Sequence, residues 1–90
     1  MSEIVNLLYN KEVRIERIYS NNATTDWMVQ NEDELVYLLN GSAVLEYSDK
    51  EIHLDKDKFE YIKRGVLHRV KSTSNDCIWL CVFIKWWIED

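Results

Sequence analysis

Residues 34–47 read ELVYLLNGSAVLEY, and this stretch decides the fold class. Leu35 to Leu39 is a continuous apolar run whose length and composition are typical of a central strand. Asn40-Gly41 follows, and an Asn-Gly pair readily adopts the positive φ angles of a tight turn. Ala43 to Tyr47 then predicts a returning strand. We therefore expect this stretch to form a β-hairpin.

Short strand-like runs separated by turn residues continue on both sides of the hairpin. Val13 to Tyr19 begins with apolar and polar residues in alternation, which suits a half-buried strand. The segment 4–9 fits either a helical turn or an edge strand. Further strands are expected at residues 51–54, 59–62, 68–70 and 78–84, the middle ones as a meander, with a polar loop over residues 71–76.

The pattern predicts a single all-β domain over residues 1–90, either a sandwich or a barrel, since no proline or long linker divides the chain. With 47% hydrophobic residues and four tryptophans, the chain is rich enough in bulky side chains to fold alone. Its net charge of −5 argues against binding nucleic acid or an anionic membrane, which require a dense basic surface. Small molecules and proteins are the favoured partners.

No apolar stretch approaches the roughly 20 residues that span a bilayer, and no basic leader followed by an apolar run is present, so we expect a cytoplasmic protein. Cys77 and Cys81 lie four positions apart on one expected strand. At about 3.3 Å per residue their separation is about 13 Å, too long for a disulfide. We expect both to be buried, reduced thiols.

Glu34 precedes the strand that ends at Gly41, and Gly65 precedes His68 by three residues. This order resembles the two sequence motifs of the cupin superfamily, and the resemblance covers most of the chain. The first motif has two histidines and a glutamate before a strand ending in glycine; the second has a proline, a glycine and a third histidine. The resemblance implies a small jelly-roll, or double-stranded β-helix, barrel.

The wider sequence is similar to a subgroup of short single-domain cupins. The shared features are VRIERI at residues 13–18, Trp and Gln at the ends of residues 27–30, and Trp-Leu at residues 79–80. The second motif differs from the family pattern in two places. Asp57 replaces its opening glycine and can still adopt a left-handed turn, and Lys63 replaces its proline.

The first motif is degenerate, because neither of its histidines is present. Their positions fall on Trp27 and Val29, or on Met28 and Gln30 if the spacing is one residue shorter. His68 and Glu34 are then the remaining metal candidates that the resemblance implies, fewer than the three or four ligands that a metal usually takes. The expected cofactor is either none or a weakly held divalent metal ion.

His68 has two interpretations: a neutral imidazole ligand pointing into the barrel, or a pocket-lining histidine without metal. Glu34 has several: a carboxylate ligand, a general base in a partly apolar pocket, or a surface residue that caps the turn at 31–33. Gln30 is a weak metal ligand but a good hydrogen-bonding group for a small polar ligand. His53 lies between Ile52 and Leu54 and is expected to face solvent.

Four aromatic residues are candidates to stack on a ligand at the mouth of the barrel, and the alternative for each is a place in the core. We expect two of the four to line a pocket. The candidates are Trp27, Tyr37, Tyr61 and Trp79.

Trp86-Trp87-Ile88 is an apolar cluster near the C-terminal end of the sequence. Exposure of this apolar cluster to solvent would be unfavourable in a monomer. We therefore expect residues 85–90 either to make a homodimer contact or to fold back over the open end of the barrel.

The leading functional hypothesis is a small-molecule-binding cupin-like protein, metal-poor or metal-free, with its pocket inside the barrel around His68, Glu34 and Gln30. One alternative is a metal-dependent cupin enzyme of the isomerase or oxygenase type that uses His68 and Glu34. Another is an interaction module that docks through Trp86-Trp87.

Overall fold

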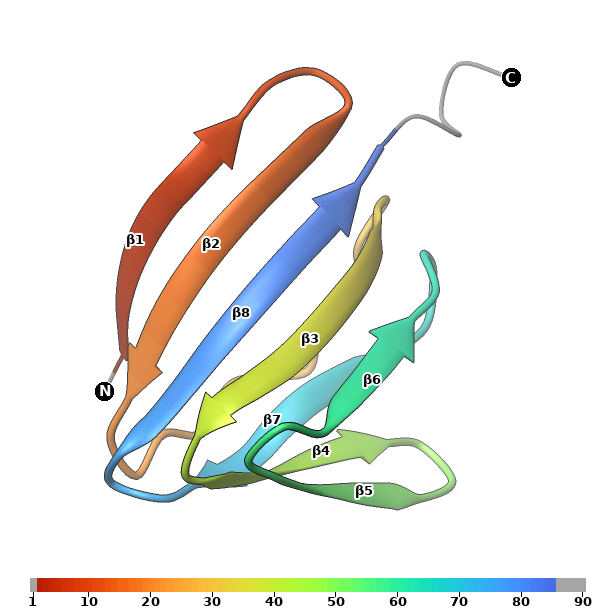
Figure 1. Cartoon of the computed structure of the whole chain (residues 1–90). Coiled ribbons are helices and arrows are strands. Elements are labelled where there is room, and N and C mark those ends of the chain that lie inside the picture. The colour runs from red at the N-terminus through yellow and green to blue at the C-terminus, as the bar shows by residue number, and fades with distance from the viewer. Residues whose placement is uncertain (1, 86–90) are drawn as a thin grey trace.

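The computed structural model describes residues 2–85 as an all-β domain, which confirms the expected fold class (Figure 1). A five-stranded sheet has the order β1-β2-β8-β3-β6, and a three-stranded sheet has the order β5-β4-β7. Within the described residues, no helix is long and apolar enough to cross a membrane. The strands are β1 (Ser2–Tyr9), β2 (Val13–Ser20), β3 (Asp33–Asn40), β4 (Ser42–Tyr47), β5 (Glu51–Asp55), β6 (Phe59–Ile62), β7 (His68–Thr73) and β8 (Cys77–Ile84).

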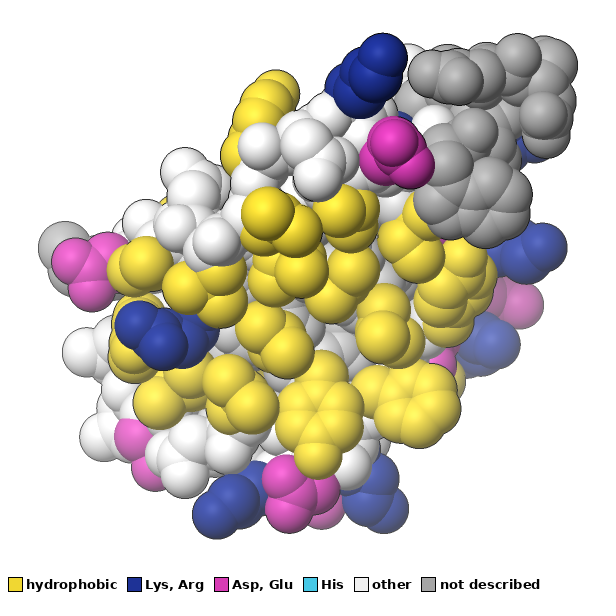
Figure 2. Space-filling view, turned by 45° about the horizontal axis from the view of Figure 1, so that its top comes forward, with side chains coloured by type: hydrophobic (Ala, Val, Ile, Leu, Met, Phe, Trp, Pro, Cys, Tyr) yellow, Lys and Arg dark blue, Asp and Glu magenta, His cyan; other side chains and the backbone are white. Residues whose placement is uncertain are grey.

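The core lies between the two sheets and is built from alternate residues of each strand. In β8, every second side chain from Cys77 to Phe83 is buried, and the residues between them are only half-buried. In β3 the inward positions include Glu34, Val36 and Leu38. Successive side chains of a strand point to opposite faces, so the half-buried residues face outward and contribute to the apolar surface in Figure 2.

The expected hairpin over residues 34–47 is wrong, although both of its strands exist. β3 pairs with β6 and β8, whereas β4 pairs with β5 and β7. Because both edges of β3 are occupied, the turn at Asn40-Gly41 carries the chain from one sheet to the other. Gly41 has φ +82°, and a Cβ there would lie 2.9 Å from the Cα of Cys77, so the crossing requires glycine.

Other segments differ from expectation in detail. β5 and β6, expected as neighbours in a meander, lie in different sheets. β7 extends to Thr73, into the expected polar loop, where the Thr73 hydroxyl accepts a hydrogen bond from the Ala23 N–H at 2.9 Å. The segment 4–9 belongs to β1, an edge strand paired with β2. Asp57 has φ 70°, the left-handed conformation expected of it.

The segment between β2 and β3, residues 21–32, runs along the free edge of β7, and we call it the strap. Met28 and His68 exchange two backbone hydrogen bonds of 2.8 and 3.0 Å, and the Thr25 N–H donates to the Val70 carbonyl at 3.0 Å. The strap therefore covers the edge of the three-stranded sheet and brings its side chains beside β7. Of the expected dimer-contact tail at residues 85–90, only Lys85 falls within the described residues.

Candidate functional site

A cavity of about 290 Å³ lies between the two sheets and the strap. Its wall is mostly apolar, with inward side chains from β2, β3, β7 and β8. Polar residues are a minority of the wall, and none of the described residues that line it is a lysine or an arginine. The polar members are Ser2, Ser20, Thr25, Gln30, Glu34 and His68.

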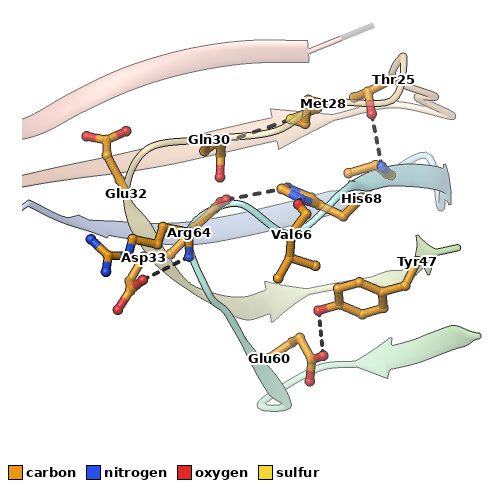
Figure 3. A network of polar contacts seen from close by, with 12 residues as sticks. Thr25, Met28, Gln30, Glu32, Asp33, Tyr47, Glu60, Arg64, Val66 and His68 are labelled. Carbon is orange, nitrogen blue, oxygen red and sulfur yellow. Dashed lines mark hydrogen bonds and ion pairs between the residues drawn. The ribbon is translucent and has the colours of Figure 1, made fainter. Parts of the chain in front are cut away.

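His68 is the first residue of β7 and is only 3% exposed. The ring Nδ1 lies 2.8 Å from the carbonyl oxygen of Val66 (Figure 3). A carbonyl can only accept, so Nδ1 carries the proton and donates it. This hydrogen bond fixes the orientation of the ring, and Nε2 then faces the carboxyl of Glu34 across 4.0 Å.

Glu34 is 7% exposed on the inward face of β3, which excludes the surface interpretation. Burial raises the pKa of its carboxyl from 4.5 to about 7, because the charged form loses its hydration. Hydrogen bonds from Cys81 and Gln30 and the positive charge of Arg14 act in the opposite direction. At neutral pH the carboxyl is therefore divided between its acid and its base form, able to donate or to accept a proton.

Gln30 reaches the cavity from the strap. Its side-chain Oε1 is buried and has no hydrogen-bond partner among residues 2–85, whereas its Nε2 contacts the Met28 sulfur at 4.0 Å, and the amide also interacts with the Glu34 carboxyl (Figure 3). A buried acceptor without a partner costs free energy, on the order of 1–3 kcal/mol. Such an atom in a cavity wall is a natural contact for a ligand that donates a hydrogen bond.

Trp79 is the one candidate aromatic that lines the cavity. It is buried, and its indole Nε1 donates to the Ser20 Oγ at 3.2 Å. Cys81 occupies the next inward position of β8, and both cysteines are buried and free, as expected. Burial and the nearby carboxyl of Glu34 hold the pKa of the Cys81 thiol well above its usual range, so the thiol does not ionise at neutral pH.

The other three candidate aromatics lie away from the cavity wall. Trp27 is 41% exposed, with the guanidinium of Arg69 5.0 Å from its ring centroid. Tyr37 and Tyr61 point outward from the five-stranded sheet, and their hydroxyls donate to the carboxylates of Asp57 and Asp33 at 3.0 and 2.6 Å.

Tyr37 and Tyr61 face outward because successive side chains of a strand point to opposite faces of the sheet. Tyr37 is three residues after Glu34, so the two side chains of β3 lie on opposite faces, and Tyr61 is register partner to the outward Leu35. The same alternation explains the contact between Cys81 and Glu34, which reasoning from sequence missed. Cys81 is two residues after Trp79, which places it on the inward face next to Glu34.

His53 is far more exposed than His68, as expected. Its side chain is 74% exposed, and its Nε2 lies 3.6 Å from a carboxylate oxygen of Glu51. The two histidines of the chain therefore occupy opposite environments, which makes His53 a matched control for His68.

The donor atoms of the site do not fit a firmly held metal ion. The described residues contain no group of three or more His, Cys, Asp or Glu side chains that could hold one. His68 and Glu34 converge but supply two protein ligands, fewer than the three found in catalytic zinc sites. The Gln30 amide and the serine and threonine hydroxyls of the wall add only neutral oxygen atoms, which are weak ligands for transition metals.

Comparison with known sequences found one matching family. The family model described as "Cupin domain" matches residues 18–83. No curated protein matches the chain.

Several solved structures share the fold. A proposed mannose-6-phosphate isomerase from Ralstonia eutropha JMP134 is similar with a TM-score of 0.89 and 26% identity, over 94% of this chain and 85% of that one. A cupin superfamily protein from Desulfitobacterium hafniense DCB-2 has a TM-score of 0.85 and 16% identity, over 93% and 77%. The EutQ protein of Clostridium difficile has a TM-score of 0.81 and 13% identity, over 93% and 68%.

Proposed function

This chain belongs to the cupin family, and from that premise we propose that it binds a small molecule in the cavity between its two sheets without a firmly held metal. The observation that carries the proposal is the set of polar atoms in an apolar wall. His68 Nε2, the carboxyl of Glu34 and the unpartnered Oε1 of Gln30 belong to the same cavity. Small-molecule sites commonly combine an apolar wall with a few placed polar groups.

The chemistry of these groups favours an uncharged ligand that donates hydrogen bonds. Gln30 Oε1 accepts, and His68 Nε2 accepts while Nδ1 is bonded to Val66. Glu34 does either, since its pKa is about 7. Because no described residue of the wall is a lysine or an arginine, a phosphate ester would lack a fixed countercharge. A small polyol or sugar meets these conditions better.

The cavity also limits the size of the ligand. Its volume of about 290 Å³ lies at the lower end of ligand pockets, which range from about 300 to 1,000 Å³. At about 30 Å³ per water, the space corresponds to about ten water molecules. A compact molecule fits this space, and a dinucleotide cofactor does not.

A second candidate function is proton transfer on such a ligand, as in an isomerase. The observation in its favour is the pair His68 and Glu34, whose Nε2 and Oε1 atoms are 4.0 Å apart, beyond direct hydrogen-bond range. A ligand hydroxyl placed between them would contact both an acceptor and a carboxyl with pKa near 7. The metal-dependent enzyme of the isomerase or oxygenase type remains a weaker alternative, because only two ligands converge.

The test combines elemental analysis with calorimetric titration of the purified full chain against a panel of small polyols and sugars. We expect less than stoichiometric metal, and binding that is weakened at least about tenfold in His68→Ala, where one hydrogen bond to the ligand is lost. His53→Ala is the matched control and should bind like the wild type. Stoichiometric Fe, Mn, Ni or Zn that disappears in His68→Ala would contradict the metal-poor site and favour the metal-dependent enzyme.

A further inference from the structure

The segment between β6 and β7, residues 63–67, contacts two of the polar residues of the cavity from outside its wall. We call this segment the β6–β7 loop. The Gly65 N–H donates to the backbone carbonyl of Gln30 at 2.8 Å. The Val66 carbonyl accepts the hydrogen bond from His68 Nδ1 at 2.8 Å. The position of this loop therefore affects where the side chains of both Gln30 and His68 lie.

The loop and the strap form one hydrogen-bonded unit. Besides the bond from Gly65 to Gln30, Met28 and His68 exchange two backbone hydrogen bonds directly after the loop. Gln30 and His68 are far apart in the sequence, yet both are linked through the backbone to the β6–β7 loop. A displacement of the loop would move the two side chains together relative to Glu34, which belongs to β3.

The sequence of the loop does little to hold its shape. Gly65 has φ +76°, and a Cβ there would meet nothing within 4 Å, so the glycine serves the left-handed backbone and not a close contact. Lys63 occupies the place where the second cupin motif has a proline, so the φ angle is not fixed there. Inside the loop, the Val66 N–H lies 3.3 Å from the Lys63 carbonyl, longer than the usual range of about 2.7–3.2 Å.

Asp33 supplies a hydrogen bond that the loop itself lacks. Its Oδ1 accepts the backbone N–H of Arg64 at 2.9 Å, and its Oδ2 accepts the hydroxyl of Tyr61 at 2.6 Å (Figure 3). The bonds from Tyr61 and Arg64 favour the charged carboxylate and lower the pKa of Asp33. Asp33 is the first residue of β3 and directly precedes Glu34. The loop is thus tied to the strand that carries the third polar group of the cavity.

We propose that Asp33 is a positioning residue for the cavity. By accepting the Arg64 N–H, it holds the β6–β7 loop where the Val66 carbonyl orients the His68 ring and the Gly65 N–H holds the backbone of Gln30. Asp33 itself does not line the cavity. The consequence for binding rests on the proposed function, whereas the effect on the loop concerns the chain without a ligand. The competing account is that the strap alone holds the loop.

The first test is ¹⁵N NMR of the imidazole rings in the full chain without ligand at pH 8, where an ordinary histidine is neutral. The spectrum distinguishes a ring protonated at Nδ1 from one protonated at Nε2. We expect the Nδ1–H form for His68 in the wild type and a mixture of both forms in Asp33→Ala. His53 is the internal control, because its 74% exposed side chain lies away from the loop and its signals should not change.

Hydrogen exchange of the Gly65 amide is the second readout, since this N–H is bonded to Gln30. We expect its exchange to be at least about tenfold faster in Asp33→Ala, because one hydrogen bond to a charged group is lost from the loop. Asp33→Asn keeps an oxygen acceptor for the Arg64 N–H and should restore the wild-type behaviour. Tyr61→Phe leaves the bond to Arg64 in place and should also behave like the wild type.

Asp33→Leu keeps about the same side-chain size without an acceptor, so a folding defect in Asp33→Ala would not decide the result. Either variant, once its circular dichroism spectrum matches the wild type, tests the proposal. An Nδ1–H ring at His68 together with unchanged Gly65 exchange would overturn it and assign the loop to the strap alone. Failure of Asp33→Asn to restore both readouts would overturn it as well.

These readouts use the chain without a ligand, so they decide the role of Asp33 even when no polyol or sugar of the calorimetric panel binds. That outcome would count against the proposed function and not against the positioning role. For a probe that does bind the wild type, we expect at least about tenfold weaker binding in Asp33→Ala and wild-type binding in Asp33→Asn.

Discussion

The cavity and the outward face of the five-stranded sheet, which we call the outer face, are opposite exceptions to the usual distribution of polar and apolar side chains. Inside, Glu34 and His68 are polar and almost completely buried. Outside, Leu35 and Tyr37 on the same strand β3 present apolar surface to solvent. One strand thus supplies both regions through its period of two. The comparison teaches that both regions carry a free-energy cost in the isolated chain, from buried polar groups in the cavity and from exposed apolar groups on the outer face. A molecule bound at either region would reduce that cost.

Aromatic truncation should show the largest difference between the two regions. Trp79→Ala removes a buried indole and its hydrogen bond to Ser20, and we expect it to lower the free energy of unfolding by about 3–5 kcal/mol. Phe59→Ala on the outer face should cost less than about 1 kcal/mol, because the ring is largely exposed in the isolated chain. Urea unfolding below 1 µM protein, where a dimer contributes least, measures both. Equal losses would remove the distinction between inside and outside.

The carboxyl of Glu34 should make the stability of the protein depend on pH. Its pKa is about 7 in the folded chain and 4.5 ordinarily, so the folded state binds the proton more tightly. The contribution of Glu34 is fully favourable below pH 4.5 and is lost as the pH rises to about 7. At pH 8 the loss is about 3 kcal/mol.

Glu34→Gln removes this titration and keeps the shape of the side chain. We expect the variant to be about 3 kcal/mol more stable than the wild type at pH 8 and nearly equal at pH 4. Urea unfolding at the two pH values is the measurement, with Glu60→Gln as a control carboxyl on β6. A wild type and variant with parallel pH profiles would show that the Glu34 carboxyl is not held in an apolar environment.

Gln30 should show a conflict between stability and binding. Gln30→Leu replaces a buried acceptor that has no partner among the described residues, so we expect the ligand-free protein to gain about 1 kcal/mol. The same variant should lose affinity for the ligand in calorimetric titration. A variant that is destabilised and binds normally would mean that Oε1 is satisfied within the folded chain.

The smallest effect is expected at the edge of the outer face. Tyr61→Phe removes the hydrogen bond from its hydroxyl to the Asp33 carboxylate while the ring stays in place. Because the bond is exposed to solvent, its loss should cost about 0.5 kcal/mol in urea unfolding. A loss above 2 kcal/mol would show that this hydrogen bond is needed for the stable pairing of β3 with β6, contrary to the expectation for a solvent-exposed contact.

Much of the fold was predictable because strand periodicity is a local property. The apolar runs at 35–39 and 78–84 identified β3 and β8, two of the three inner strands of the five-stranded sheet. The crossing at Asn40-Gly41 was not predictable, since the same turn residues serve a hairpin or a change of sheet. Which of the two forms is decided by the partners of β3, and those partners are distant in the sequence.

The candidate site was predictable in part for the same reason. The motif spacing identified His68 and Glu34, and the structure brings their side chains to 4.0 Å. Residue type alone did not separate Trp79, which faces the cavity, from Tyr37, which faces outward. Strand parity, counted from Glu34 and from Trp79, would have assigned Tyr37 and Cys81 to their faces.

The most direct test of the central claim is a ¹H–¹⁵N NMR titration that follows the tryptophan indole N–H signals. The Trp79 Nε1–H lies in the cavity wall, bonded to Ser20, whereas Trp27 is 41% exposed on the surface. Each signal is assigned with a Trp→Phe variant, and the probes are the polyols and sugars of the calorimetric panel. The account predicts that a binding probe shifts the Trp79 signal, leaves the Trp27 signal in place, and needs at least about tenfold more probe for the same Trp79 shift in His68→Ala. A binding probe that shifts Trp27 and leaves Trp79 unchanged would contradict it.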